Sequence, residues 1–186
     1  MTAGDVLTET SGRGTDTVRA SQTYALATTA NIEKLETISV SATTTINLTG
    51  NALAQTIIGN NGVNKITGGG GKDTMSGKNG RDTFDFNALS DMTKSGSTTD
   101  VITDFTRGQD KIDLNTIDAN SKLGGNQNFT FLSAKGAAFT GVAGQLHYKA
   151  LGANTLIEGD IDGNRTADFA ILLTGNKILA KTDFIL

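Results

Sequence analysis

The chain has 186 residues, a formal net charge of −3 and a sequence pI near 5.1, with 23 glycines and no proline, cysteine or tryptophan. An acidic chain without a basic run or interleaved aromatics is not typical of nucleic-acid binding, and no apolar stretch is long enough to span a bilayer. Without cysteine no disulfide can stabilise the fold, and the polar segment 1–20 gives no expectation of a cleavable secretory signal.

The acidic residues are unevenly divided, with 15 Asp and only 4 Glu. Asp is favoured in tight turns and near cations, whereas Glu would dominate on helix surfaces. Abundant Asp together with abundant Gly therefore predicts many tight turns, some of them built around metal ions.

Residues 1–48 have no strict period. The segment NIEKLE (31–36) is a candidate for a short helical turn. The apolar residues of this region are expected to face inward from strands, and they are Val18, Leu35, Ile38, Val40, Ile46 and Leu48.

A nine-residue repeat begins at Gly50 and covers residues 50–85 as GNALAQTII, GNNGVNKIT, GGGGKDTMS and GKNGRDTFD. Glycine-rich positions one to six predict a turn, and the last three residues predict a short strand with its middle side chain inward. Two repeats complete a coil of about 18 residues, so coils stack as parallel strands. Ile57 is then expected over Met75, and Ile66 over Phe84.

Position six of the repeat reads Gln55, Asn64, Asp73 and Asp82. Adding 18 residues to the two aspartates reaches Asp91 and Asp100, which predicts two columns of stacked carboxylates. Like charges about 4 Å apart repel by roughly 4 kcal/mol at an effective dielectric of 20. A hard divalent cation with oxygen ligands removes this repulsion, and Ca²⁺ fits flexible all-oxygen loops best. A metal-free solenoid or an incidental glycine-rich loop is the alternative.

The C-terminal part changes to longer strands, expected as antiparallel pairs over the end of the roll: FTFL, GQLHYKAL, NTLIEGDI and DFAILLTG. His147, the single histidine, is expected to be a half-exposed structural residue. The loop GDIDGNRTAD departs from the EF-hand pattern, so a plain hairpin turn is favoured over a calcium loop there.

GGGGKDTMS matches the GGxGxDxUx calcium nonapeptide of RTX proteins. Together with DVITDF (100–105), GQDKIDL (108–114) and GRGTDTV (12–18), it makes the chain resemble the C-terminal region of serralysin-type proteins. The resemblance implies an all-β fold, a parallel β-roll with a C-terminal antiparallel β segment as its cap. The expected domains are a roll over 1–120 and a cap with a secretion signal over 121–186.

The resemblance also implies ligands for Ca²⁺. One turn supplies Gly69, Gly70, Gly71 and Asp73, the next supplies Lys78 and Asn79 (main chain), Gly80 and Asp82, and Asp91, Asp100 and Asp110 close the sites. Asn64 is an expected weak ligand, because Asn64 and Gln55 are neutral where the family has Asp. Asp104 and Asp113 are adjacent candidates, expected as turn and strand-edge residues.

The function predicted on this basis is a non-catalytic module of a larger secreted bacterial protein that folds on calcium outside the cell. The terminal Asp183–Leu186 resembles the signal read by a type I secretion ABC transporter, although an ordinary last strand is the alternative. No HExxH zinc motif is present, so serralysin protease activity does not carry over. The alternative function is a polysaccharide-binding or adhesin module, and an enzyme in its own right is the third.

Overall fold

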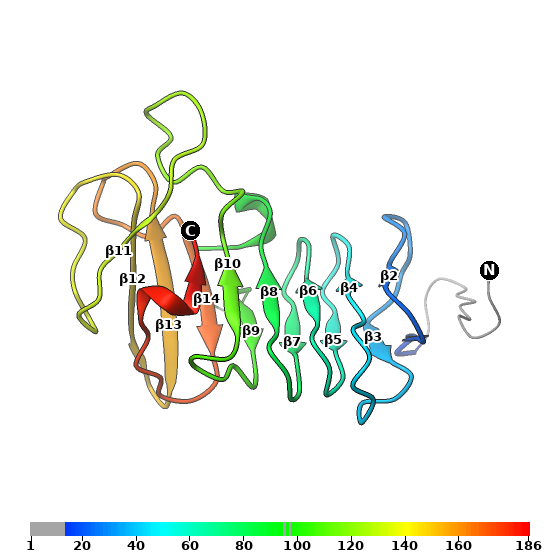
Figure 1. Ribbon diagram of the computed structural model, residues 1–186. Coiled ribbons are helices and arrows are strands. Elements are labelled where there is room, and N and C mark those ends of the chain that lie inside the picture. Colours follow the sequence, from blue (N-terminus) through cyan, green and yellow to red (C-terminus); the bar gives the residue numbers. More distant parts are fainter. Residues whose placement is uncertain (1–13, 95, 97) are drawn as a thin grey trace.

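The computed structural model describes residues 14–94, 96 and 98–186, and in them the chain winds through stacked coils (Figure 1). Each coil gives one short strand to each of two sheets, which enclose one apolar core. The expected turn at 12–18 and the segment 1–20 lie partly outside the described residues. In the described part, no helix is long and apolar enough to cross a membrane.

The first sheet, sheet A, has nine strands. Five parallel strands from the coils are followed by β14, which is also parallel to its coil neighbour. The β14–β13 and β13–β12 pairs are antiparallel, and β11 pairs with β12 in parallel. Their order is β1 (Thr17–Ala20), β3 (Lys34–Thr37), β5 (Thr56–Ile58), β7 (Thr74–Ser76), β9 (Asp100–Ile102), β14 (Phe169–Leu173), β13 (Asn154–Asp160), β12 (Gln145–Leu151) and β11 (Thr130–Phe131).

The second sheet, sheet B, has six strands, all parallel to their neighbours. The chain also has two 3₁₀ turns, η1 (Leu89–Asp91) between β8 and β9, and η2 (Lys181–Asp183) directly before β15. The order of the sheet is β2 (Tyr24–Ala25), β4 (Leu48–Thr49), β6 (Lys65–Thr67), β8 (Thr83–Asp85), β10 (Lys111–Asp113) and β15 (Phe184–Ile185).

The register between coils confirms the nine-residue reading. Ile57 pairs with Met75 in sheet A and Ile66 with Phe84 in sheet B, as the repeat predicts. Each of these middle side chains is fully buried. Each of these three-residue strands buries only its middle apolar side chain in the core, so the roll is stable only because its coils share one core.

The N-terminal coils follow the same plan with irregular loops. Val18 pairs with Leu35, which in turn pairs with Ile57, and all three are buried. The expected helical turn at 31–36 is wrong: residues 34–37 form β3, because Leu35 fills the core between neighbouring coils. Ile38 and Val40 were also expected inside, but they lie in the loop after β3 and are 58% and 45% exposed.

The predicted C-terminal strands correspond to β11, β12, β13 and β14. The predicted antiparallel pairing holds for β12–β13 and β13–β14 and is wrong for β11, which pairs with β12 in parallel. These strands extend sheet A rather than lying across its end, because β14 pairs with β9 in parallel. The sheet thus runs unbroken past residue 120, and the proposed boundary at 120/121 stays a prediction. His147 lies in β12 and is buried, so its expected half-exposure is wrong.

Candidate metal sites

Two columns of polar residues run along the edges of the roll, where each residue directly precedes a strand or, in the case of Asp100, begins one. Along one edge, Gln55, Asp73 and Asp100 precede or begin β5, β7 and β9. Along the other edge lie Asn64, Asp82 and Asp110, before β6, β8 and β10. Repeat position six therefore recurs in each coil from Gln55 onward, and Asp100 and Asp110 continue it after the glycine pattern has ended.

Within each column, a carboxylate of one coil accepts a backbone N–H of the preceding coil. Asp73 Oδ1 accepts from the Gln55 N–H at 2.8 Å, and Asp100 Oδ1 accepts from the Asp73 N–H at 2.7 Å. On the other edge, Asp82 Oδ1 accepts from Asn64 at 2.9 Å and Asp110 Oδ1 from Asp82 at 3.0 Å. These bonds fix the carboxylates between adjacent coils.

The second carboxylate oxygen of two of these residues has no partner. Asp73 Oδ2 and Asp82 Oδ2 are buried and form no hydrogen bond within the described structure. The hydroxyl of Thr99, directly before Asp100, is unpaired and buried as well. An unpaired buried polar atom costs about 1–3 kcal/mol, more when it carries charge, so such atoms call for a ligand.

In the earlier coils, the neutral residues at the same repeat position have hydrogen-bond partners for both of their polar side-chain atoms. Gln55 exchanges two hydrogen bonds with Asn51, through its Oε1 and its Nε2. Asn64 Oδ1 accepts from the Asn60 N–H, and its Nδ2 donates to the Ile46 carbonyl. An amide has both a donor and an acceptor, so these turns close on themselves, whereas a carboxylate cannot donate.

Burial makes the charged form of these aspartates unfavourable. It raises the pKa of Asp73 and Asp100 to about 7, and the nearby charge of Asp91 adds to both shifts, against backbone hydrogen bonds that lower them. Burial likewise raises the pKa of Asp82 to about 7 and raises that of Asp110, with the Asp104 charge adding to both. A bound divalent cation would reverse this penalty.

The main chain of the turns is held in conformations that bring it close to the previous coil. Gly69 and Lys78 share repeat position two, and both are left-handed, with φ of 89° and 72°. At position four, a Cβ added to Gly80 would lie 2.1 Å from the Gly62 carbonyl oxygen. The coils therefore stack backbone against backbone, which places peptide oxygens beside the carboxylates.

The expected stacking of Asp91 on Asp73 and of Asp100 on Asp82 is wrong. The loop 86–99 lengthens this coil, so that Asp100 follows Asp73 by 27 residues and Asp110 follows Asp82 by 28. Asp91 lies in η1 inside that loop, where its Oδ2 accepts from the N–H groups of Asn87 and Ala88. It remains near enough for its charge to act on Asp73 and Asp100.

Asp104 plays a larger part than its expected role of turn residue. Its carboxylate accepts from the N–H groups of Gly77 at 3.1 Å and Lys78 at 3.0 Å, and from the Ser76 hydroxyl. These donors belong to the turn that ends at Asp82. The sequence feature that could have indicated this role is the position of Asp104 two residues beyond β9, one coil after that turn. Asn79 instead donates its side chain to Asn61, and Asp113 lies on β10 as expected.

The residues present fit a calcium ion on both edges. The unpaired oxygens of Asp73 and Asp82 belong to carboxylates in glycine-rich turns, and all-oxygen ligation of this kind is what Ca²⁺ prefers. On one edge Asp73, Asp100 and the turn at Gly69–Gly71 would hold the ion. On the other edge Asp82, Asp110 and the turn at Lys78–Gly80 would hold it.

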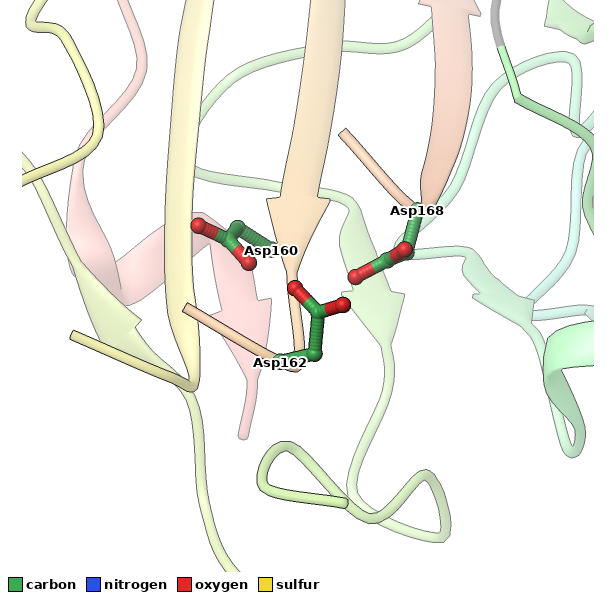
Figure 2. A group of neighbouring side chains, drawn as sticks. All are labelled: Asp160, Asp162 and Asp168. Carbon is green, nitrogen blue, oxygen red and sulfur yellow. The ribbon is translucent and has the colours of Figure 1, made fainter. Parts of the chain in front are cut away.

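A third acidic group lies at the end of β13 and in the β13–β14 loop (Figure 2). One oxygen each of Asp160, at the end of the strand, and of Asp162 and Asp168, in the loop, lie within 4.8 Å of one another. The oxygens of Asp160 accept from the N–H groups of Gly163 and Arg165. Those of Asp162 accept from Asn164, and those of Asp168 from Ile161 and Lys94. Every oxygen has a donor, as in a hydrogen-bonded hairpin loop, and we assign no metal here.

Comparison with known proteins identifies a matching family and two similar solved structures. The profile of the peptidase M10 serralysin C-terminal family matches residues 11–186. The R2 subunit of the AlgE6 mannuronan C5-epimerase from Azotobacter vinelandii has a similar solution structure, with 24% identity, a TM-score of 0.56 and coverage of 83% of this chain and 87% of that one. The R3 subunit of the same enzyme is 22% identical, with a TM-score of 0.49 and coverage of 88% and 82%. No curated protein sequence matches the chain.

Proposed function

The chain belongs to the peptidase M10 serralysin C-terminal family, and on that premise we propose that it is a calcium-binding RTX module that folds when calcium fills its turns. The family describes the C-terminal part of serralysin and not its catalytic part. We propose accordingly that the module is non-catalytic and belongs to a larger, secreted protein.

One observation carries the calcium proposal: the buried, unpaired Oδ2 atoms of Asp73 and Asp82. In each case the other oxygen is already committed to a backbone N–H. The free oxygen faces its own turn, since a Cβ added to Gly68 would lie 2.3 Å from Asp73 Oδ2, and one added to Gly77 2.2 Å from Asp82 Oδ2. A cation beside these oxygens supplies the partner that the polypeptide does not.

The energetics make calcium a switch for folding. Extracellular modules bind calcium at about 10⁻⁴–10⁻³ M, well above the concentration in a cell. Each site filled at 100 times its dissociation constant adds about 2.7 kcal/mol to the folded state. Two sites together approach the lower end of the total stability of a small domain, about 5 kcal/mol. The chain would thus stay loose before export and fold outside.

A calcium titration followed by circular dichroism tests the proposal. The expected result is β-sheet signal that appears with calcium, disappears with excess chelator and returns when calcium is restored. Magnesium at the same concentration is the matched ion, and we expect it to be much weaker, because it requires near-ideal octahedral geometry. A chain that is fully folded in excess chelator and binds no calcium would refute the proposal.

The second part of the proposal concerns the C-terminal residues Asp183–Leu186, which we propose a type I secretion ABC transporter reads. In the folded chain, β15 pairs with β10 and Asp183 accepts hydrogen bonds from the N–H groups of Gly108 and Ala180. Phe184 packs on Phe131, with ring centroids 5.0 Å apart. The transporter would therefore meet these residues only before the roll folds.

A secretion assay in a host with a type I apparatus tests this part separately. Deletion of residues 183–186 is expected to abolish export, while Asp73→Asn, which leaves the terminus intact, is expected to permit it. Export of the truncated chain at the full rate would refute the transporter proposal and leave the calcium proposal untouched.

A further inference from the structure

A pocket of about 500 Å³ opens on the C-terminal part of sheet A, apart from the turns of the roll. Side chains of β12 and β13 form part of its lining, and the β13–β14 loop and residues 138–139 complete it. Its volume lies within the range of small-molecule sites, about 300–1,000 Å³. The residues that bear on its chemistry are Phe139, His147, Lys149, Glu158, Arg165 and Thr166.

A buried carboxylate belongs to this pocket. Glu158 Oε2 accepts from His147 Nε2 at 2.8 Å and from Lys149 Nζ at 2.7 Å, and the Glu158 side chain is only 6% exposed. Burial alone would raise the pKa of Glu158, but the hydrogen bonds from His147 and Lys149 outweigh it and hold the pKa below its ordinary value. Glu158 is thus an ionised acceptor in a fixed position.

His147 is held in place on both sides of its ring. Its Nε2 faces Glu158 and its Nδ1 faces the Ala137 carbonyl, so both ring nitrogens point at acceptors. Phe139 stacks on the imidazole, with ring centroids 4.1 Å apart, and gives the pocket an aromatic surface.

Arg165 brings a further cation. Its backbone is left-handed, with φ of 70°, and its N–H donates to Asp160 Oδ2. The guanidinium packs over Gly141, where an added Cβ would lie 2.9 Å from Arg165 Nε. No ion pair of the described residues involves Arg165, and the three loop aspartates do not line the pocket. The lining therefore holds more positive than negative charge.

We propose that this pocket binds a sugar acid, a carboxylate that also carries hydroxyl groups. The carboxylate would pair with Arg165 and Lys149, a hydroxyl would donate to Glu158, and the C–H face of the ring would lie on Phe139. A guanidinium and a carboxylate form strong charge-assisted hydrogen bonds, while a fixed acceptor selects hydroxylated ligands. The pocket shares no residue with the calcium sites, so the two proposals stand separately.

The test is a ¹H–¹⁵N NMR titration of the full chain in calcium, after circular dichroism has verified the fold. The probes are D-galacturonate, its trimer, neutral galactose, and acetate. Galacturonate is expected to shift the amide signals of Phe139 and Thr166 and to bind at least about ten-fold more tightly than galactose or acetate. Equal binding of galactose or of acetate, or no shift at these amides, would overturn the proposal.

Variants of Arg165 tie the binding to the pocket. Arg165→Gln is expected to weaken galacturonate binding by about ten-fold or more, because it removes a charge-assisted pair, and Arg165→Lys is expected to weaken it less. Arg19→Gln, on β1 at the opposite end of sheet A, is the matched control and should bind as the unmodified chain does. Unchanged binding in Arg165→Gln would overturn the proposal. Tighter binding of the trimer would identify a polymer as the source of the ligand, and equal binding a free acid.

Discussion

The backbone N–H of Asp73 donates a 2.7 Å hydrogen bond to Oδ1 of Asp100, a residue 27 positions further along the chain. The glycine repeat has a spacing of 18 residues per coil, as between Gln55 and Asp73. The extra residues form the loop 86–99 with η1, yet the carboxylate returns to the same edge of the roll. The column of carboxylates is thus preserved where the sequence period is not, which indicates that the position itself is required.

Asp73→Asn is expected to change stability in opposite directions with and without calcium. Without calcium the variant should be more stable by about 1–2 kcal/mol, because an amide at this position can pair its second polar atom, as Asn64 does. With calcium at 100 times the dissociation constant it lacks the roughly 2.7 kcal/mol that the lost site supplies, so after that gain it should be less stable than the unmodified chain by about 0.7–1.7 kcal/mol. Denaturant unfolding in chelator and in calcium measures both effects.

The matched control for that comparison is Asp16→Asn. Asp16 lies directly before β1, and its position in the first described coil is remote from β7 and β9 (Figure 1). It should shift the midpoint little in either condition. A loss of stability in Asp73→Asn that is the same with and without calcium would show that the residue serves only the fold.

The calcium-free chain should become less stable as the pH rises from about 5 to 8. Burial, the largest cause, raises the pKa of Asp73, Asp82 and Asp100 to about 7 in the folded chain, against a model-peptide value of 3.8. The folded state therefore keeps protons that the unfolded state has released, and its advantage is lost as the pH passes through 7. Each such proton contributes at most about 1.4 kcal/mol per pH unit.

Unfolding of metal-stripped protein at a series of pH values measures this slope. The double variant Asp73→Asn/Asp82→Asn should flatten it, and saturating calcium should reverse it, since calcium binds the deprotonated carboxylates. Stability that rises with pH in the calcium-free chain would contradict the raised pKa values. The pH range for this measurement ends near about 5. In more acidic solution Glu158, whose pKa is lowered in the folded chain, becomes protonated, and this lowers the stability of the folded chain as the pH falls.

The roll could be predicted because the nine-residue spacing of its glycines and apolar residues is visible in the sequence. Ile57 and Met75 stand 18 residues apart and pair in the structure. The same rule misplaced Asp91, since an inserted loop changes the coil length without changing the residue types. Leu35 faces inward from a strand as expected, whereas the candidate helical turn at 31–36 was wrong, because core packing at Leu35 overrides the helix propensity of its neighbours. The His147 pocket joins segments from residues 138 to 167, which no local pattern connects.

Gly71→Ala should destabilise the roll strongly. Gly71 has φ of 94°, and an added Cβ would lie 2.7 Å from the carbonyl carbon of Leu53 in the preceding coil. Gly136→Ala is the matched control, because Gly136 also has a positive φ, 77°, but nothing lies within 4 Å of its added Cβ. Left-handed strain of about 1–2 kcal/mol applies to both, and overpacking adds about 1–3 kcal/mol at Gly71 alone. Unfolding in calcium measures the difference, and equal losses would contradict the close stacking of the coils.

Phe184→Ala tests whether the last strand contributes to the core. Phe184 is 7% exposed, pairs with Ile112 of β10 and contacts Phe131, while the next residue, Ile185, is 36% exposed. Truncating a buried Phe costs about 3 kcal/mol or more through lost burial and the cavity left behind. Truncating a largely exposed side chain costs less than about 1 kcal/mol.

Phe184→Ala should therefore lower the denaturant midpoint in calcium well below that of Ile185→Ala, with the same dependence on denaturant in both variants. The pair differs in burial and not in distance from the chain terminus, so a frayed end would affect both alike. Equal, small losses in the two variants would mean that β15 leaves sheet B readily in solution. In that case the terminal residues would stay accessible after folding, and a transporter would not need to read them first.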